Sequence, residues 1–115
     1  MTGPICSIAA SLLTDEIAWV QAAPGVRRAV LVSRPELMLV AVRFEAGAVG
    51  APHQHPHVQA SYVAEGAFDV TIDGATTRLE QGASFIVAPN LVHGVVALKE
   101  GLLIDTFAPC RGDFL

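Results

Sequence analysis

The chain has 115 residues, of which 52% are hydrophobic, and its formal net charge is −4. This length leaves room for one domain, residues 1–115, with enough apolar side chains to form a core without disulfide or metal staples. Lys and Arg together number 7 against 11 acidic residues, and no stretch gathers them into a basic patch, which argues against nucleic acid as a partner.

The N-terminal segment, residues 1–25, is more apolar than a minimal β domain needs. We expect this segment, with Trp19, to cover a barrel edge or a homodimer interface. Residues 14–21 predict a helix, with Thr14 as its N-cap and Asp15 and Glu16 in its first turn. The sequence therefore predicts a helical element within a covering segment.

Two features favour a cytoplasmic protein. The apolar stretch at residues 5–13 is too short to span a bilayer and follows no basic region, so we expect no membrane anchor or signal peptide. Cys6 and Cys110 lie near opposite termini and form no C-x-x-C motif. We expect reduced thiols in the cytosol, which could pair only if the terminal strands are neighbours.

The remainder of the chain predicts an all-β fold. Short apolar segments recur about every ten residues, separated by Gly, Pro, Asn or Asp, as in a sandwich or barrel. Asp73-Gly74 between two of them predicts a two-residue hairpin, since both turn positions favour positive φ. The expected strands span residues 28–32, 38–44, 59–64, 68–72, 76–79, 84–88, 94–98 and 102–107.

The histidines gather in one region of the chain. All 4 lie between positions 53 and 93, three of them in the stretch H-Q-H-P-H-V-Q at residues 53–59. In a strand, His53 and His55 point to one face, so both imidazoles can reach one ion. His93, after the Pro89-Asn90 turn, can approach the same ion from another segment. This arrangement predicts a metal site.

Gln59 can join the site only if the chain bends. A straight strand would carry it about 20 Å from His53, too far for a shared metal. Pro56 favours the bend, which would bring Gln59 back on the next strand. Gln59 could instead be an ordinary strand residue near the metal. We expect His57, on the bend, to face solvent or substrate rather than to act as a fourth imidazole ligand.

The spacing of these residues resembles the cupin superfamily. The first cupin motif is matched by Gly47, His53, His55, Gln59 and Gly66, and the second by Gly82, Pro89, Asn90 and His93. Gln59 departs from the usual Glu, and Ala88 and Asn90 replace the usual Pro and Gly. The resemblance implies a single-domain jelly-roll barrel, or double-stranded β-helix. It also implies one divalent transition metal bound through His53, His55, Gln59 and His93.

A narrower resemblance covers the C-terminal half. Residues 53–59, 88–94 and 105–111, the last reading D-x-F-x-P-x-R, are similar to the small pectin-degradation cupins of the KdgF type. That family converts 4,5-unsaturated monouronates from pectin or alginate into a linear keto form. The resemblance implies Asp105 and Arg111 as catalytic residues and Phe107 and Arg111 as substrate-binding residues. It also implies a small anionic sugar-acid substrate and a homodimer.

Physical reasoning supports these roles. Three imidazoles and an amide are neutral, so the ion keeps its charge and favours an anionic ligand; the set does not distinguish Ni, Zn, Fe, Mn, Co or Cu. By strand parity Asp105 shares a face with Phe107 and could move a proton, while Arg111 could bind a carboxylate with its fork. Alternatively, Asp105 is solvated at a turn, Phe107 is a core or dimer contact, and Arg111 pairs with Asp113.

The predicted function is therefore a metal-dependent isomerase or tautomerase of an unsaturated uronate. A three-His dioxygenase acting on a small organic substrate is one alternative, which oxygen consumption by iron-loaded protein would distinguish. A non-enzymatic small-ligand-binding cupin is the other, which binding without turnover would reveal.

Overall fold

The computed structural model describes residues 9–115, so the predictions about Cys6 lie outside the described part of the chain. These residues form ten β-strands and one short 3-10 helix. None of their helices is long and apolar enough to cross a membrane. The elements are β1 Val20–Ala23, β2 Val26–Arg34, β3 Leu37–Phe44, β4 Val49–His53, β5 Val58–Glu65, β6 Ala67–Ile72, β7 Ala75–Glu80, β8 Ser84–Val87, β9 His93–Ala97, β10 Gly101–Ala108 and η1 Gly112–Phe114.

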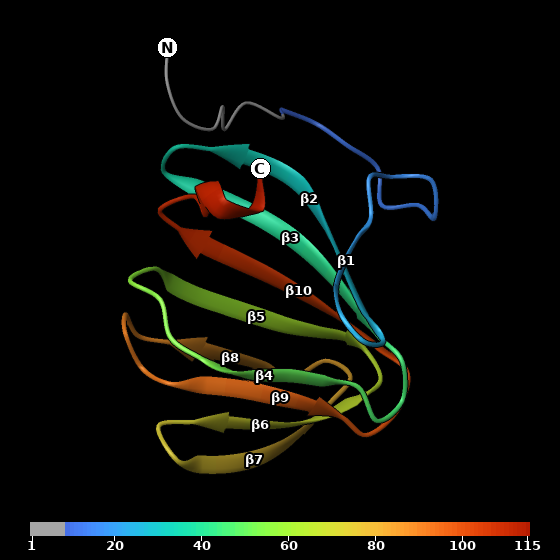
Figure 1. The fold of residues 1–115 in the computed structure, drawn as a ribbon, viewed down its shortest axis with the longest axis vertical. Coiled ribbons are helices and arrows are strands. Elements are labelled where there is room, and N and C mark those ends of the chain that lie inside the picture. The colour runs from blue at the N-terminus through green and yellow to red at the C-terminus, as the bar shows by residue number, and fades with distance from the viewer. Residues whose placement is uncertain (1–8) are drawn as a thin grey trace.

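The strands build two antiparallel sheets (Figure 1). The larger has the order β1-β2-β3-β10-β5-β8 and the smaller the order β4-β9-β6-β7. Sequence neighbours such as β5 and β6 fall into different sheets, while distant β3 and β10 pair along their length. The prediction of an all-β jelly roll is confirmed by this architecture.

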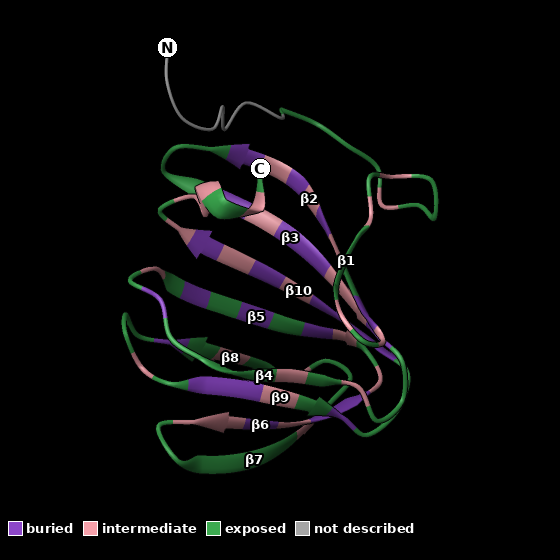
Figure 2. Cartoon of the chain, in the orientation of Figure 1, coloured by how far each residue is buried: buried purple, intermediate pink, exposed green. Residues whose placement is uncertain are grey.

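Alternation of burial explains most strands. Along β5, inward residues such as Gln59, Ser61 and Val63 alternate with exposed ones, visible as alternating colours in Figure 2. The hairpin between β6 and β7 turns at Asp73, with φ of 50°, and Gly74, with φ of 83°, as the sequence predicts. All eight predicted strands are present within one or two residues of their expected ends.

The helix predicted at residues 14–21 is wrong. The chain makes a turn there, in which the backbone N–H of Glu16 donates to the Thr14 hydroxyl oxygen at 3.2 Å. It then enters β1, which pairs with β2. Leu13, Ile17 and Trp19 pack against a buried cluster of Leu31, Ala41 and Leu102. Packing against the sheet therefore outweighs the local preference for a helix. A few favourable capping residues cannot stabilise a helix in so short a segment.

The core lies between the two sheets. Phe44 of β3 meets Phe68 of β6 edge to face, with ring centroids 5.1 Å apart. One stretch of the inner surface of the larger sheet is polar, because the buried side chains of Gln59, Ser61 and Asp105 interrupt its apolar rows. Asp105 of β10 stands directly opposite Ser61 of β5. The fold thus carries a polar site within an apolar interior.

Candidate metal centre

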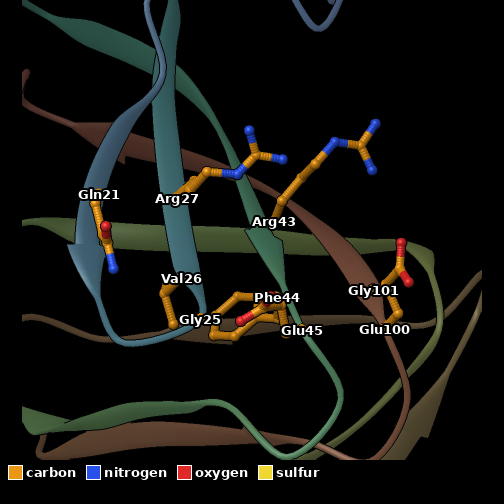
Figure 3. A pocket seen from close by; sticks show the side chains of 9 residues that line it. All are labelled: Gln21, Gly25, Val26, Arg27, Arg43, Phe44, Glu45, Glu100 and Gly101. Atoms are coloured by element: carbon orange, nitrogen blue, oxygen red, sulfur yellow. The ribbon is translucent and has the colours of Figure 1, made fainter.

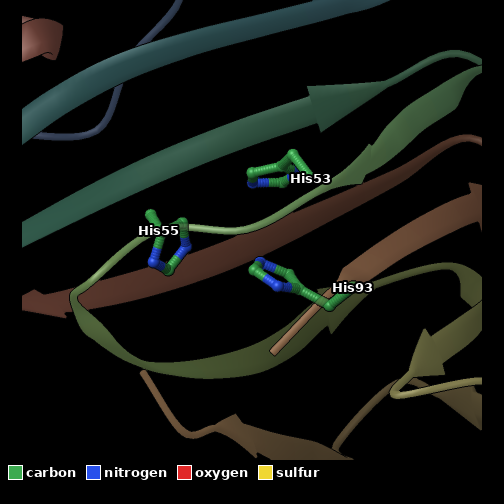
Figure 4. A group of neighbouring side chains, drawn as sticks. All are labelled: His53, His55 and His93. Carbon is green, nitrogen blue, oxygen red and sulfur yellow. The ribbon is translucent and has the colours of Figure 1, made fainter. Parts of the chain in front are cut away.

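Three histidines converge from three segments (Figure 4). His53 ends β4 and stands opposite His93, the first residue of β9. His55 follows β4 in an irregular segment and does not continue the strand. One ring nitrogen from each of the three lies within 4.8 Å of the others. These three imidazoles could hold a metal ion.

A backbone hydrogen bond joins the segment that contains His55 to the turn that precedes His93. The N–H of Asn90 donates to the carbonyl of His55 at 2.8 Å. Asn90 has a φ of 65°, a conformation that Asn tolerates better than most residues. The chain bends at Pro56 and His57 and returns in β5 with Gln59 on the inner face. The bend that the sequence predicts at Pro56 is therefore present.

The imidazoles are oriented by carbonyl groups. The Nδ1 atoms of His53, His55 and His93 lie 2.9, 3.1 and 2.9 Å from backbone carbonyl oxygens two residues away. A carbonyl oxygen only accepts a hydrogen bond, so each Nδ1 carries the proton and each Nε2 keeps a lone pair. This tautomer is the one in which Nε2 can bind a metal, with the other nitrogen fixed by an outer partner.

The Gln59 side chain completes a donor set that fits a cation. Its Oε1 lies 3.0 Å from Nε2 of His55 and 3.2 Å from Nε2 of His93. With Nδ1 protonated, all three of these atoms present lone pairs and share no proton. A divalent cation satisfies such a cluster of neutral nitrogen and oxygen ligands. Gln59 thus reaches the three-histidine group from a separate strand.

A chain of hydrogen bonds fixes the Gln59 amide. Its Nε2 donates to the Ser61 hydroxyl at 3.0 Å, and that hydroxyl donates to Oδ1 of Asp105 at 2.6 Å. The carboxylate accepts, so the hydroxyl proton points to Asp105 and its oxygen accepts from the amide. This direction of donation turns Oε1 of Gln59 toward the histidines.

Burial shifts the ionisation of the site. It lowers the pKa of His55 and of His93, so both rings favour the neutral form that binds metal. Burial also raises the pKa of Asp105 to about 6, although the Ser61 hydrogen bond and the charge of Arg111 act in the opposite direction. Asp105 can therefore exchange a proton near neutral pH.

The site opens into a cavity of about 390 Å³. Its lining includes His53, Gln59, His93, Asp105, Phe107 and Arg111. The ring of Phe107 lies 5.6 Å from that of His55 and 5.6 Å from that of Phe114. All the sequence-predicted site residues except His55 thus line a single cavity.

Known proteins with similar sequences place this architecture in a family. Residues 40–104 match the cupin domain. The chain is also 44% identical over 105 residues, 90% of its length, to the pectin degradation protein KdgF of Dickeya dadantii strain 3937, of which 96% is covered. The chain is a cupin, and it belongs with the KdgF-type pectin degradation proteins.

Solved structures agree with this assignment. The cupin is similar to KdgF from Halomonas sp., with 42% identity and a TM-score of 0.85 over 93% of this chain and 100% of that one. It is also similar to an RmlC-like cupin from Shewanella frigidimarina NCIMB 400, with 41% identity and a TM-score of 0.89 over 95% and 97% of the two chains.

The sequence left open whether Arg111 pairs with Asp113 and whether His57 belongs to the metal site. Arg111 pairs with Asp113: its Nε and one terminal nitrogen donate to the two carboxylate oxygens at 3.3 and 2.8 Å. This contact lowers the pKa of Asp113.

His57 is not among the three clustered histidines. Its ring lies 5.4 Å from that of His55.

Sequence reasoning missed Ser61, which hydrogen-bonds to Gln59 and Asp105, and two residues of the cavity lining. Ser61 is two positions after Gln59, so strand alternation alone could have placed it on the same face. Phe114 and Arg28 line the cavity from η1 and β2. No local pattern marks Arg28, because its approach depends on how β2 joins the larger sheet.

Proposed function

We propose that this cupin is a metal-dependent isomerase that converts a 4,5-unsaturated monouronate, released from pectin or alginate, into its linear keto form. The observation that carries the proposal is the buried Asp105 carboxyl beside three convergent imidazoles, in a chain similar to KdgF over 90% of its length. The relative's name supports pectin breakdown as the setting.

His53, His55 and His93, with Gln59, would hold one divalent metal. Such an ion supplies Lewis-acid polarisation of a substrate oxygen. The donor set is neutral, so it leaves the charge of the ion uncompensated and favours an anionic substrate.

Asp105 would move the proton that turns the enol into the ketone. Its pKa, raised to about 6 by burial, suits a group that both gives and takes a proton near neutral pH. Ser61 holds one carboxylate oxygen at 2.6 Å and so fixes the position of the group. Phe107, 3% exposed, forms an apolar wall beside it. Arg111 would face the carboxylate of the sugar acid.

The test is turnover by metal-reconstituted protein. Unsaturated galacturonate, or its alginate counterpart, is mixed with the protein and the ultraviolet absorbance of the ring double bond is followed. The proposal expects the absorbance to fall faster than in buffer with metal alone, and to fall little with Asp105→Asn. Wild-type protein that binds metal but leaves both substrates unchanged would contradict it.

We also propose that the protein is a homodimer. The outer surface of the larger sheet exposes Tyr62 at 49% and Ile86 at 67%, and these large apolar side chains support burial against a second copy. Sedimentation at micromolar concentration tests this, and a monomer there would contradict it.

A further inference from the structure

Arg28 faces the cavity that contains the imidazoles. It stands opposite Val42 of β3, which stands opposite Leu103 of β10. All three residues line the cavity, so Arg28 lies on the inner surface of the larger sheet. Its neighbour Arg27 points to the other surface and lines a separate cavity of about 400 Å³, where Figure 3 shows it beside Arg43.

Phe114 holds Arg28 close to Arg111. The guanidinium carbons of Arg28 and Arg111 each lie 4.1 Å from the centroid of the Phe114 ring. Stacking on a ring orients a guanidinium without using its N–H donors. The short η1 helix therefore gathers two positive charges at the cavity.

The two arginines differ in how many of their N–H donors are already used. The fork of Arg111 is occupied by both carboxylate oxygens of Asp113. Among the described residues, no acidic side chain forms an ion pair with Arg28. The N–H donors of Arg28 are therefore available to a ligand in the cavity.

The charge of the cavity favours an anion. Among the described residues that line it, Asp105 is the only acidic one, against Arg28 and Arg111. The chain as a whole carries −4, so positive charge is concentrated where the three imidazoles stand. The planar fork of an arginine can bind a carboxylate through two parallel hydrogen bonds, and a carboxylate is the anionic group of a sugar acid.

We propose that Arg28 donates its free N–H groups to the carboxylate of the sugar-acid substrate, with Phe114 as its stacking support. Arg111, already paired with Asp113, faces the same carboxylate as a second positive charge. This inference rests on the proposed function for the identity of the substrate. It assigns the specificity for acids over neutral sugars to β2, outside both cupin motifs.

The test measures equilibrium binding of non-reacting probes to metal-loaded protein. D-galacturonate carries the carboxylate and D-galactose lacks it. Arg28→Met keeps the length of the side chain and removes its charge, while Arg27→Met makes the same change on the other surface of the sheet. Arg28→Lys keeps the charge without the fork. Titration calorimetry reports the affinity, and thermal unfolding shows that each variant is folded.

We expect Arg28→Met to weaken galacturonate binding by about tenfold to a hundredfold, with galactose binding unchanged and Arg27→Met equal to wild type. If Arg28→Met does not fold, Arg28→Lys is expected to lose part of the affinity. Wild-type affinity for galacturonate in the folded Arg28 variant, or no preference for galacturonate in the wild type, overturns the inference. If Arg28→Met loses affinity for galacturonate and the wild-type protein does not turn over unsaturated uronates, the role of Arg28 is upheld and the proposed function is rejected.

Discussion

Substituting Ser61 with Ala tests the hydrogen-bond chain behind the metal centre. The change removes the acceptor of the Gln59 amide, at 3.0 Å, and the donor to Asp105, at 2.6 Å. Gln59 and Asp105 are 6% and 7% exposed, so water can replace the lost hydroxyl only poorly. The Gln59 amide would then be free to rotate its oxygen away from His55 and His93.

The expected effect has two parts. Loss of a residue that orients a metal ligand typically weakens metal binding by about tenfold to a hundredfold. The buried groups left without partners lower the free energy of unfolding by about 1–3 kcal/mol. Metal affinity is measured by competition with a chromophoric chelator, using Zn²⁺ or Ni²⁺. Stability is measured by urea unfolding of the metal-free protein.

Two further variants separate positioning from packing. Ser33→Ala is the matched control, because the buried hydroxyl of Ser33 has no hydrogen-bond partner within residues 9–115. This variant should leave metal affinity unchanged. Ser61→Thr retains a hydroxyl and should restore most of the affinity. If Ser61→Ala loses stability but binds metal as tightly as wild type, Ser61 does not position Gln59 and the reasoning is refuted.

Three other predictions follow from particular residues. In metal-free protein, folding favours the neutral form of Asp105, because burial raises the pKa of this carboxyl from 3.8 to about 6. Protonated Asp105 therefore contributes fully to stability at pH values below 3.8. This contribution, up to about 3 kcal/mol, is lost as the pH rises through about 6. Urea unfolding across that range should show this fall, and an equal fall in Asp105→Asn would contradict it. His57→Ala should bind metal with wild-type affinity in the chelator assay, since its ring is outside the three-histidine group; a tenfold loss would make it a ligand. Gly66→Ala should cost more stability than Gly74→Ala: both glycines have φ near 85°, but a Cβ at Gly66 would lie 2.6 Å from the Glu100 carbonyl oxygen while one at Gly74 meets nothing within 4 Å. Equal unfolding midpoints for the two variants would count against this packing.

The sequence predicted those features that depend on local chemistry. Asp73-Gly74 defines its own turn through positive φ, and alternation in β5 places Gln59 on the inner face. The spacing of the histidines indicated a shared site, and His53, His55 and His93 do converge.

The features that depend on distant contacts were missed. Strand β4 contains Gly50 and Pro52 and shows no alternation of burial, so only its pairing with β9 reveals it as a strand. The helix expected at residues 14–21 gives way to a turn because Leu13 and Trp19 pack against the larger sheet. Arg28 enters the site only once β2 is placed beside β3. These features therefore depend on contacts between distant parts of the chain, which local sequence propensity does not reveal.

Metal binding by the three histidines is the claim on which the proposed chemistry depends. Calorimetric titration of metal-free protein with Zn²⁺ or Ni²⁺ tests it directly, with His93→Ala as the comparison. One equivalent of metal should bind per wild-type chain, and removal of the His93 imidazole should weaken that binding by at least about tenfold. A folded wild-type protein that takes up no stoichiometric metal would contradict the account.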